Sequence, residues 1–202
     1  MTHLYFAVEG GRTLELARAY VAERSAVEKR NRETAVELGA ERYVVSILDG
    51  TISGVEFDGN AHPDFKKPDR RGVSFPKKGS EWAAKLAAAK GYDRRGYRLA
   101  EALGVPTTIN YTTESGHGSS VISRSFNSGV GFLYLSETGP FALYIPDIAE
   151  VVARHEAIGH TVCDECKNFK PSFDGARPIL KEEWELVIAQ YELEEAKKRI
   201  AA

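Results

Sequence analysis

Residues 43–57, YVVSILDGTISGVEF, carry the strongest local signal for the fold. Two runs rich in β-branched and aromatic residues flank Asp49-Gly50, a pair that favours a tight turn between antiparallel strands. The stretch therefore predicts a β-hairpin closed by a two-residue turn. Four further runs of this kind lie within residues 107–145, with turn residues between them. They predict an antiparallel meander that could extend the same sheet.

Four helices are predicted before and after these strands. They are marked by stretches without Pro or Gly and by N-cap residues, namely Thr13, Ser80 and Asp147. The expected helices cover residues 14–38, 81–90, 147–159 and 180–200. Strands and helices together predict an α+β fold, a mainly antiparallel sheet with helices packed on it, in a single domain of residues 1–202. Residues 58–79, with three prolines and three glycines, are expected to be a mobile basic insertion.

The composition is that of a folded protein without a membrane span. Apolar residues make up 43% of the chain and charged residues 28%. No apolar run approaches the roughly 20 residues needed to cross a bilayer, and the opening MTHLYFAVEGG lacks the features of a secretion signal. The two cysteines lie too close in sequence for a useful structural disulfide. A cytoplasmic location is therefore expected.

Residues 65–98, named here the basic strip, differ electrically from the rest of the chain. The strip holds eleven Lys and Arg against three acidic residues, a formal charge of +8 in a chain whose net charge is −2. Aromatic residues are interleaved with these charges, a mixture that suits an anionic partner such as nucleic acid. The predicted binding residues are Lys66, Lys67, Arg70, Arg71, Lys77, Lys78, Arg94, Arg95, Arg98, Trp82 and Tyr92.

Three interpretations of the basic strip remain open. Its charges could neutralise phosphates while its rings stack on exposed bases, which would suit single strands or RNA. The same charges could instead dock on an acidic protein, because electrostatic steering favours both partners equally. In the third interpretation the charges form a solvated face, and rings such as Phe75, Trp82 and Tyr97 belong to the core.

Four potential metal ligands lie within twelve residues: His155, His160, Cys163 and Cys166. Imidazole and thiolate are good zinc ligands and C-x-x-C is a common zinc-knuckle spacing, so the alternatives are a structural zinc or no cofactor. The segment HEAIGH has one residue too many for the H-E-x-x-H metalloprotease pattern. Redox use of the thiols is not indicated, because the two acids of C-D-E-C would disfavour a thiolate.

No catalytic residue can be assigned from the sequence. Residues 114–120, ESGHGSS, bring Glu, His and Ser together but match neither the G-x-S-x-G elbow nor a phosphate-binding loop. The alternative to a binding protein is a hydrolase of phosphoesters that uses His117, His155 and His160. A third class is a phage assembly component whose acidic helices pack on copies of itself, which would make it a homo-oligomer.

Three segments in the first half of the chain are LYFAVEGG (residues 4–11), GAERYVV (residues 39–45) and GVSFPKKGSEW (residues 72–82). With the Ala- and Glu-rich helix between the first two, they resemble small uncharacterised proteins of tailed phages and prophages. None of the matching residues forms a catalytic motif, so no functional residue is carried over. The resemblance implies action in the host cytoplasm, where such proteins often bind nucleic acid or block host nucleic-acid machinery, including defence systems.

The leading prediction is thus a non-enzymatic α+β protein that engages nucleic acid, or a host complex that handles nucleic acid, through the basic strip. It would act by occupancy, covering phosphates or imitating a natural ligand so that access is blocked. This prediction depends on one condition, that the cations of the strip gather on a single exposed face and are neither scattered around the molecule nor already matched by the protein's own carboxylates.

Overall fold

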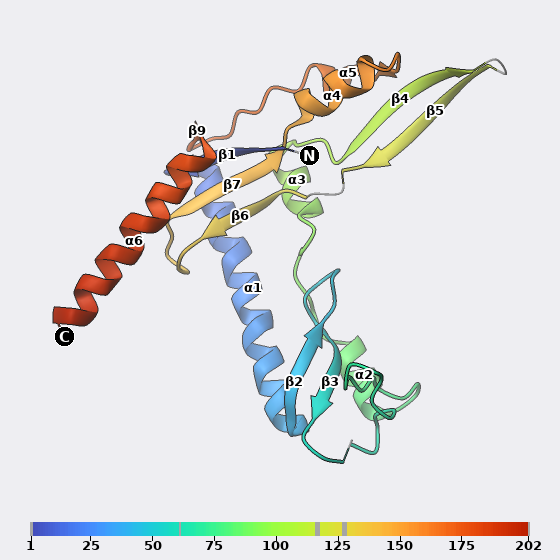
Figure 1. The fold of residues 1–202 in the computed structure, drawn as a ribbon, viewed down its shortest axis with the longest axis vertical. Helices are drawn as coiled ribbons and strands as arrows, with labels where there is room; N and C mark the ends of the chain where they lie inside the picture. Colours follow the sequence, from blue (N-terminus) through green and yellow to red (C-terminus); the bar gives the residue numbers. More distant parts are fainter. Residues whose placement is uncertain (1, 61, 116–117, 127–128, 202) are drawn as a thin grey trace. The chain divides into compact units, whose positions relative to one another are not determined.

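The structure, a computed structural model, describes residues 2–60, 62–115, 118–126 and 129–201 (Figure 1). The fold is α+β with antiparallel sheets, as predicted. Contacts divide the chain into two compact units, where the sequence predicts one domain. Unit 1 comprises Met1–Ala19 and Arg95–Ala202, and unit 2 comprises Tyr20–Arg94. Each unit has its own sheets and its own buried apolar residues.

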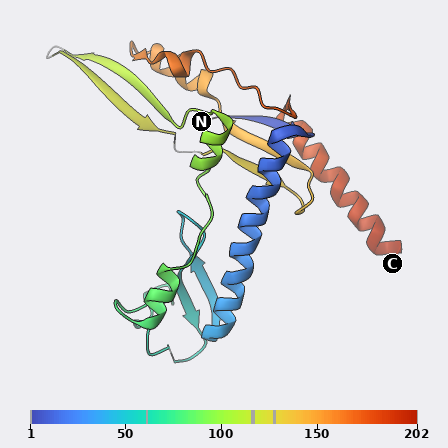
Figure 2. The ribbon, with the colours of Figure 1, turned by 180° about the vertical axis from the view of Figure 1, so that it is seen from behind.

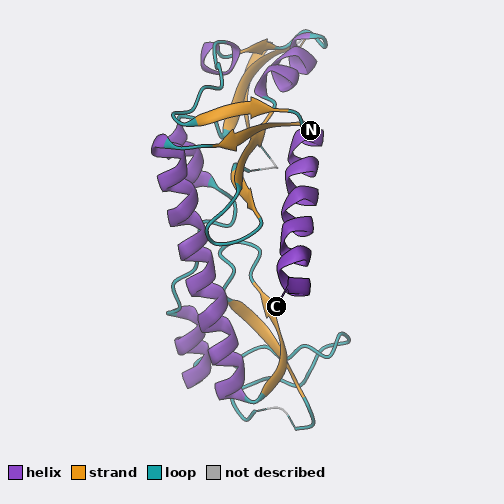
Figure 3. Ribbon diagram, turned by 90° about the vertical axis from the view of Figure 1, so that its left-hand side faces the viewer, coloured by secondary structure: helices purple, strands orange, loops and turns teal. Residues whose placement is uncertain are grey.

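Helix α1 (Gly11–Leu38) is one uninterrupted helix that starts in unit 1 and continues into unit 2 (Figures 1 and 3). Its first turn is held by Asp174, whose carboxylate accepts the N–H of Arg12 at 2.7 Å. The carbonyl of Asp174 also accepts the Thr13 hydroxyl at 2.5 Å. Asp174 therefore takes the capping role predicted for Thr13, and the helix begins three residues earlier than the predicted residue 14.

Unit 1 is built on a four-stranded antiparallel sheet in the order β6-β7-β1-β9 (Figure 1). Its strands are β1 (His3–Val8), β6 (Gly131–Tyr134), β7 (Phe141–Pro146) and β9 (Ala176–Ile179). Ala142 and Leu143 of strand β7 are both fully buried and point to opposite faces of the sheet, so both faces of that strand are covered. Strand β9 lies in a segment that the sequence marks as a loop, and its pairing with β1 has no local signal.

The predicted meander of residues 107–145 is divided between two sheets, and neither contains the hairpin of residues 43–57. β4 (Thr108–Ser115) and β5 (Gly118–Ser125) form a hairpin that pairs with the short β8 (Thr161–Val162). Figures 1 and 2 show this hairpin as a projecting two-stranded ribbon, and most of β5 is exposed. A β-branched composition marks strands, but it does not indicate which sheet each strand joins.

Four helices complete unit 1: α3 (Tyr97–Leu103), α4 (Ile148–Glu156), α5 (Asp164–Lys167) and α6 (Lys181–Ala201). Asp147 caps α4 as predicted, because its carboxylate accepts the N–H of Glu150 at 3.0 Å. In α6, Trp184 is buried whereas Leu186 and Leu193 are exposed. Within the described residues, no helix combines the length and the apolar character that a membrane crossing requires.

Unit 2 contains a two-stranded sheet, β2 (Ala40–Val45) and β3 (Ile52–Phe57), and helix α2 (Glu81–Ala87). The predicted hairpin is confirmed, but the prediction that a two-residue turn closes it is wrong. Ser46 N–H donates to the carbonyl of Thr51 at 2.7 Å, so the turn has four residues, and Gly50 N–H donates back to Ser46 at 3.1 Å. Gly50 can end this turn because its φ of 71° is accessible to glycine.

A small apolar core holds unit 2 together. Leu38, Ile52, Val55 and Phe65 are buried in it, and Trp82 packs against them. Ser80 caps α2 as predicted, because its hydroxyl accepts the N–H of Ala83 at 3.2 Å. The core thus joins α1, the hairpin and the segment that precedes α2.

Candidate functional site

The basic loop, defined here as residues 64–78, is bonded to the sheet of unit 2. Ser74 exchanges two backbone hydrogen bonds with Val55 of β3, at 2.7 and 2.9 Å. Within the loop, Lys66 N–H donates to the carbonyl of Phe75 at 2.9 Å, so the two arms of the loop run side by side. Phe65 fixes one arm in the apolar core. The predicted insertion is therefore anchored through its backbone and through its apolar side chains.

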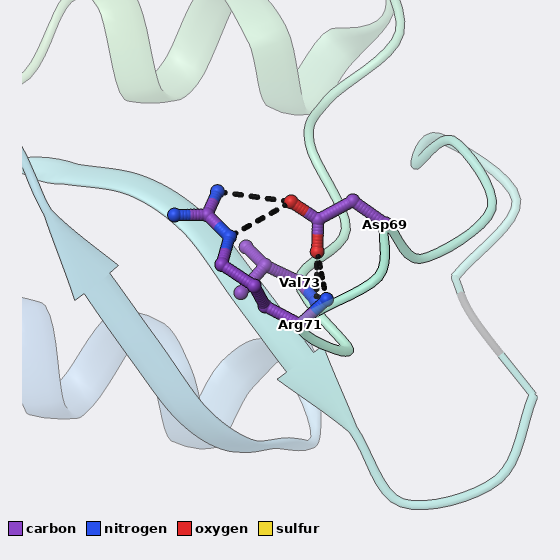
Figure 4. A network of polar contacts seen from close by, with 3 residues as sticks. All are labelled: Asp69, Arg71 and Val73. Atoms are coloured by element: carbon purple, nitrogen blue, oxygen red, sulfur yellow. Dashed lines mark hydrogen bonds and ion pairs between the residues drawn. The ribbon is translucent and has the colours of Figure 1, made fainter.

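Asp69 organises the tip of the basic loop (Figure 4). Its Oδ1 accepts the backbone N–H groups of Arg71 and Val73, at 2.8 and 3.1 Å. Its Oδ2 accepts Nη2 and Nε of the Arg71 guanidinium, at 2.9 and 3.1 Å. These bonds lower the pKa of Asp69, and the backbone bond from Arg71 contributes most to that lowering. Arg71 is thus matched by a carboxylate of its own loop.

Four other cations of the basic loop are exposed and have no acidic partner within ion-pair distance among the described residues. They are Lys66, Lys67, Arg70 and Lys78. The loop as a whole has six cations and two acids, a formal charge of +4. Unit 2 has fourteen Lys and Arg and twelve Asp and Glu, a formal charge of +2. The positive charge of unit 2 is therefore concentrated on the basic loop.

The remaining cations predicted as binding residues are engaged or belong to unit 1. Lys77 Nζ donates to the carbonyl of Pro63 at 2.6 Å. Arg94 Nη1 donates to the carbonyl of Ser46 at 2.9 Å and helps to hold the hairpin turn. Arg95 and Arg98 belong to unit 1. The candidate surface of unit 2 is therefore the basic loop and not the whole basic strip.

Two rings of the basic strip that are predicted to bind, Trp82 and Tyr92, pack inward, which argues against their stacking on bases. Tyr92 is only 9% exposed, and its ring lies edge-on to Tyr20 with 6.4 Å between centroids. Trp82 packs against the core of unit 2, and Nζ of Lys85 lies 4.2 Å from the centroid of its ring. Stacking on a base needs an open ring face, so these residues serve the fold.

A second candidate site is the Tyr–His cluster of unit 1, defined as Tyr111 of β4, His155 of α4 and His160. The ring of Tyr111 stacks on His160 at 4.6 Å between centroids and lies 4.2 Å from the ring of His155. The two histidine Nδ1 atoms are 3.0 Å apart, so one ring donates a hydrogen bond to the other. Burial lowers the pKa of His155, and nearby cationic groups, His160 first, lower it further. His155 is therefore neutral at pH 7.

The two cysteines follow β8 and differ sharply from each other. Cys163 is partly exposed at the start of α5, whereas Cys166 is 2% exposed and its thiol donates to the carbonyl of Thr108 at 3.5 Å. Burial acts to raise the pKa of Cys163, but hydrogen bonds with Cys166 and Asn110 outweigh it and the net pKa is lowered. Burial, followed by the neighbouring Cys163, raises the pKa of Cys166 to about 12. Glu165, one of the two intervening acids, disfavours the thiolate of Cys163 as expected, but the hydrogen bonds outweigh its effect.

The four residues predicted as zinc ligands form two pairs, His155 with His160 and Cys163 with Cys166. Among the described residues, no three His, Cys, Asp or Glu side chains come together as a group that could hold a metal ion. The histidines turn their Nδ1 atoms toward each other, and Cys166 turns its thiol to Thr108. The structural zinc stays a prediction that this geometry does not support.

The larger of the two described cavities is an apolar groove of unit 1, with a volume of about 390 Å³. Leu4 and Phe6 of β1, Ile179 of β9 and Glu183 of α6 are among its lining residues. Neither described cavity contains His155 or His160, and His117 lies outside the described residues. Neither of these two cavities therefore gathers the histidines that the alternative hydrolase would use.

Comparisons with protein-family models, with curated proteins and with solved structures find no match to this chain. The resemblance to phage proteins therefore stays a prediction. A function has to be inferred from the geometry and the charge of the described residues.

Proposed function

We propose that the protein is a non-enzymatic binding protein whose basic loop contacts the phosphate backbone of nucleic acid. The proposal is supported by one observation, the four exposed cations that an anchored loop presents without acidic partners among the described residues. Such cations neutralise phosphates and release condensed counterions, which drives association. Because the loop is already bonded to β3, little backbone entropy is lost on binding.

The surface suits phosphates better than bases. Phosphate contacts fix the position of a protein on nucleic acid but do not read sequence. Since Tyr92 is buried and Trp82 packs on the core, neither of the rings predicted to bind offers an open stacking platform. We therefore expect weak sequence preference and similar affinity for a duplex and for a single strand.

The same surface is less suited to an acidic protein. Protein interfaces usually place aromatic or apolar anchors at their centre. In the basic loop, Phe65 and Val73 are buried, so its exposed side chains are charged apart from Pro68. A phosphate backbone requires no apolar anchor. The mechanism is occupancy, in which the loop covers phosphates and hinders other proteins from reaching them.

The test measures the affinity of the full-length protein for a fluorescent DNA duplex by anisotropy in low-salt buffer. The loop variant carries three charge reversals, Lys66→Glu, Lys67→Glu and Arg70→Glu. It should bind about thirtyfold more weakly than the wild type, a loss of roughly 2 kcal/mol. The three positions are exposed, so the far-ultraviolet circular dichroism spectrum and the unfolding midpoint should stay unchanged.

A control variant makes the same charge change outside the loop, at exposed cations that have no acidic partner among the described residues. It carries Arg18→Glu, Arg32→Glu and Lys170→Glu. Its affinity should stay within a few fold of the wild type. The proposal is abandoned if the wild type does not bind in low salt, or if the two variants lose affinity equally.

A further inference from the structure

The cysteine pair belongs to unit 1 and has no part in the proposed function. We propose that Cys163 and Cys166 are a reversible dithiol–disulfide couple that exchanges with disulfides, with Cys163 as the attacking sulfur and Cys166 as the resolving sulfur. The substrate class is a disulfide, either the small-molecule glutathione disulfide or a disulfide on another protein.

The two thiols are placed so that a bond between them needs little movement. Cys163 is the N-cap of α5, and Cys166 lies three residues later in the single turn of that helix. Side chains at this spacing on a helical turn have Cβ atoms about 5–6 Å apart. A disulfide needs Cβ atoms roughly 3.5–4.5 Å apart. The two thiols are close enough for each to shift the pKa of the other, so a small closure suffices.

The surroundings of the two sulfurs assign their roles. An incoming disulfide can reach the partly exposed Cys163 but not Cys166, which is buried. The thiolate is the form that attacks a disulfide, and the lowered pKa of Cys163 agrees with the role that its exposure assigns. Cys166 is kept as a thiol by burial and by its bond to the Thr108 carbonyl. Glu165 opposes the thiolate of Cys163 but ranks last among the causes.

The exchange runs in two balanced steps. The Cys163 thiolate attacks one sulfur of the substrate disulfide, a Cys163–substrate disulfide forms, and the other substrate sulfur leaves as a thiolate. Cys166 then gives its proton to a departing thiolate and attacks Cys163, which forms the Cys163–Cys166 disulfide and releases the second substrate thiol. Counted from the dithiol, whose Cys163 proton first goes to solvent, the protein loses two electrons and two protons, and the substrate disulfide gains two electrons and takes up two protons. The reverse sequence reduces the protein.

The test incubates the reduced full-length protein with glutathione disulfide and follows its intact mass. The wild type should lose two hydrogens and retain no glutathione, and peptide mapping should find the Cys163–Cys166 bridge. Cys166→Ser should instead accumulate one glutathione on Cys163. Cys163→Ser should stay unmodified, since Cys166 is buried. Before oxidation, iodoacetamide at neutral pH should alkylate Cys163 at least about tenfold faster than Cys166.

Several results would overturn the couple. A wild type that keeps two thiols, or that carries glutathione on both cysteines, has no internal exchange. Equal alkylation rates would remove the difference between attacking and resolving sulfur. Stoichiometric zinc in the protein purified without chelators, with both thiols protected from alkylation, would assign the pair to a metal. Residue 163 is partly exposed, so the variant Cys163→Ser is expected to fold. The mass measurement on the wild type does not depend on any variant.

Discussion

The basic loop of unit 2 and the Tyr–His cluster of unit 1, with the cysteines beside it, hold their ionisable groups in opposite ways. In the loop, Lys66, Lys67 and Arg70 are exposed and the backbone beneath them is hydrogen-bonded to a strand. In the cluster, His155 is shielded against Tyr111 and bonded to another histidine. Under the two proposals, the loop would act through its field on a partner, whereas unit 1 would act through the protonation of His155 and the redox state of the cysteines.

If both proposals hold, one chain separates binding from chemistry. The interactions of exposed cations depend on salt, because ions screen them. Shielded groups depend on pH and on redox conditions, because burial and hydrogen bonds change which form is stable. A change made in one region should therefore alter the stability, affinity or pH dependence of that region and leave the other region unchanged.

The largest effect is expected from Phe65→Ala, which removes the apolar anchor of the basic loop. Loss of this buried ring should lower the free energy of unfolding of unit 2 by about 3–5 kcal/mol. Unit 2 contains Trp82 and unit 1 contains Trp184, so urea unfolding followed by tryptophan fluorescence in a Trp184→Phe background reports on unit 2. The Cys163 alkylation rate should not change.

Phe65→Leu is the matched control, because it keeps an apolar side chain in the same core and should cost much less. An unchanged unfolding midpoint for Phe65→Ala would contradict the anchoring of the loop. An equal shift of the unfolding of both units would show that the two regions are not independent.

A smaller effect separates the two arginines at the tip of the loop. Arg70→Ala should weaken nucleic-acid binding roughly threefold to tenfold, about 0.7–1.4 kcal/mol, because Arg70 has no acidic partner among the described residues. Arg71→Ala should change the affinity by less, since Asp69 already compensates this charge. Anisotropy titrations of both variants check this order, and an equal or reversed loss would show that the Asp69–Arg71 pair opens on binding.

The smallest effect is the pH dependence of unit 1. Because the folded-state pKa of His155 lies below its ordinary value of 6.5, the unfolded state binds the proton more readily. The stabilisation is therefore complete above about pH 6.5 and is lost as the pH falls through the lower folded-state pKa. A positive charge on His155 is disfavoured by three neighbours, His160, Arg124 and Arg154. None of the causes of this shift is an anion that would favour the protonated form.

Urea unfolding of unit 1 between pH 7 and pH 5, read from Trp184 in a Trp82→Phe background, measures this dependence. His3 has a lowered pKa and contributes in the same direction, so the readout is the difference between the wild type and His155→Gln. The variant should have the flatter profile. Parallel profiles would assign the pH dependence to other groups.

Local features of the fold are predictable from the sequence because they depend on neighbouring residues. Ser80 and Asp147 cap their helices as expected, and the two strands of residues 43–57 pair as a hairpin. Features set by distant residues are not predictable in this way. Asp174 caps α1 from a segment 161 residues beyond Thr13, and β9 joins β1 across nearly the whole chain. No local pattern marks either contact.

The candidate sites show the same contrast between features set by neighbouring residues and features set by distant residues. Charge density identifies the basic loop in the sequence, but it does not show that Asp69 compensates Arg71 or that Tyr92 is buried. The spacing of His155, His160 and the cysteines marks a cluster, yet Tyr111 comes from a distant strand and gives no signal. The pKa difference between the thiols depends on burial and then on hydrogen bonds, neither of which the letters C-D-E-C encode.

The central claim is that exposed cations of the basic loop bind phosphates. The most direct test is the salt dependence of duplex binding, plotted as log K against log salt, for the wild type and the loop variant. Each phosphate contact contributes about −0.9 to the slope, so the loop variant should be shallower by roughly 3. Equal slopes for the two proteins would contradict the account, because they would place the phosphate contacts elsewhere.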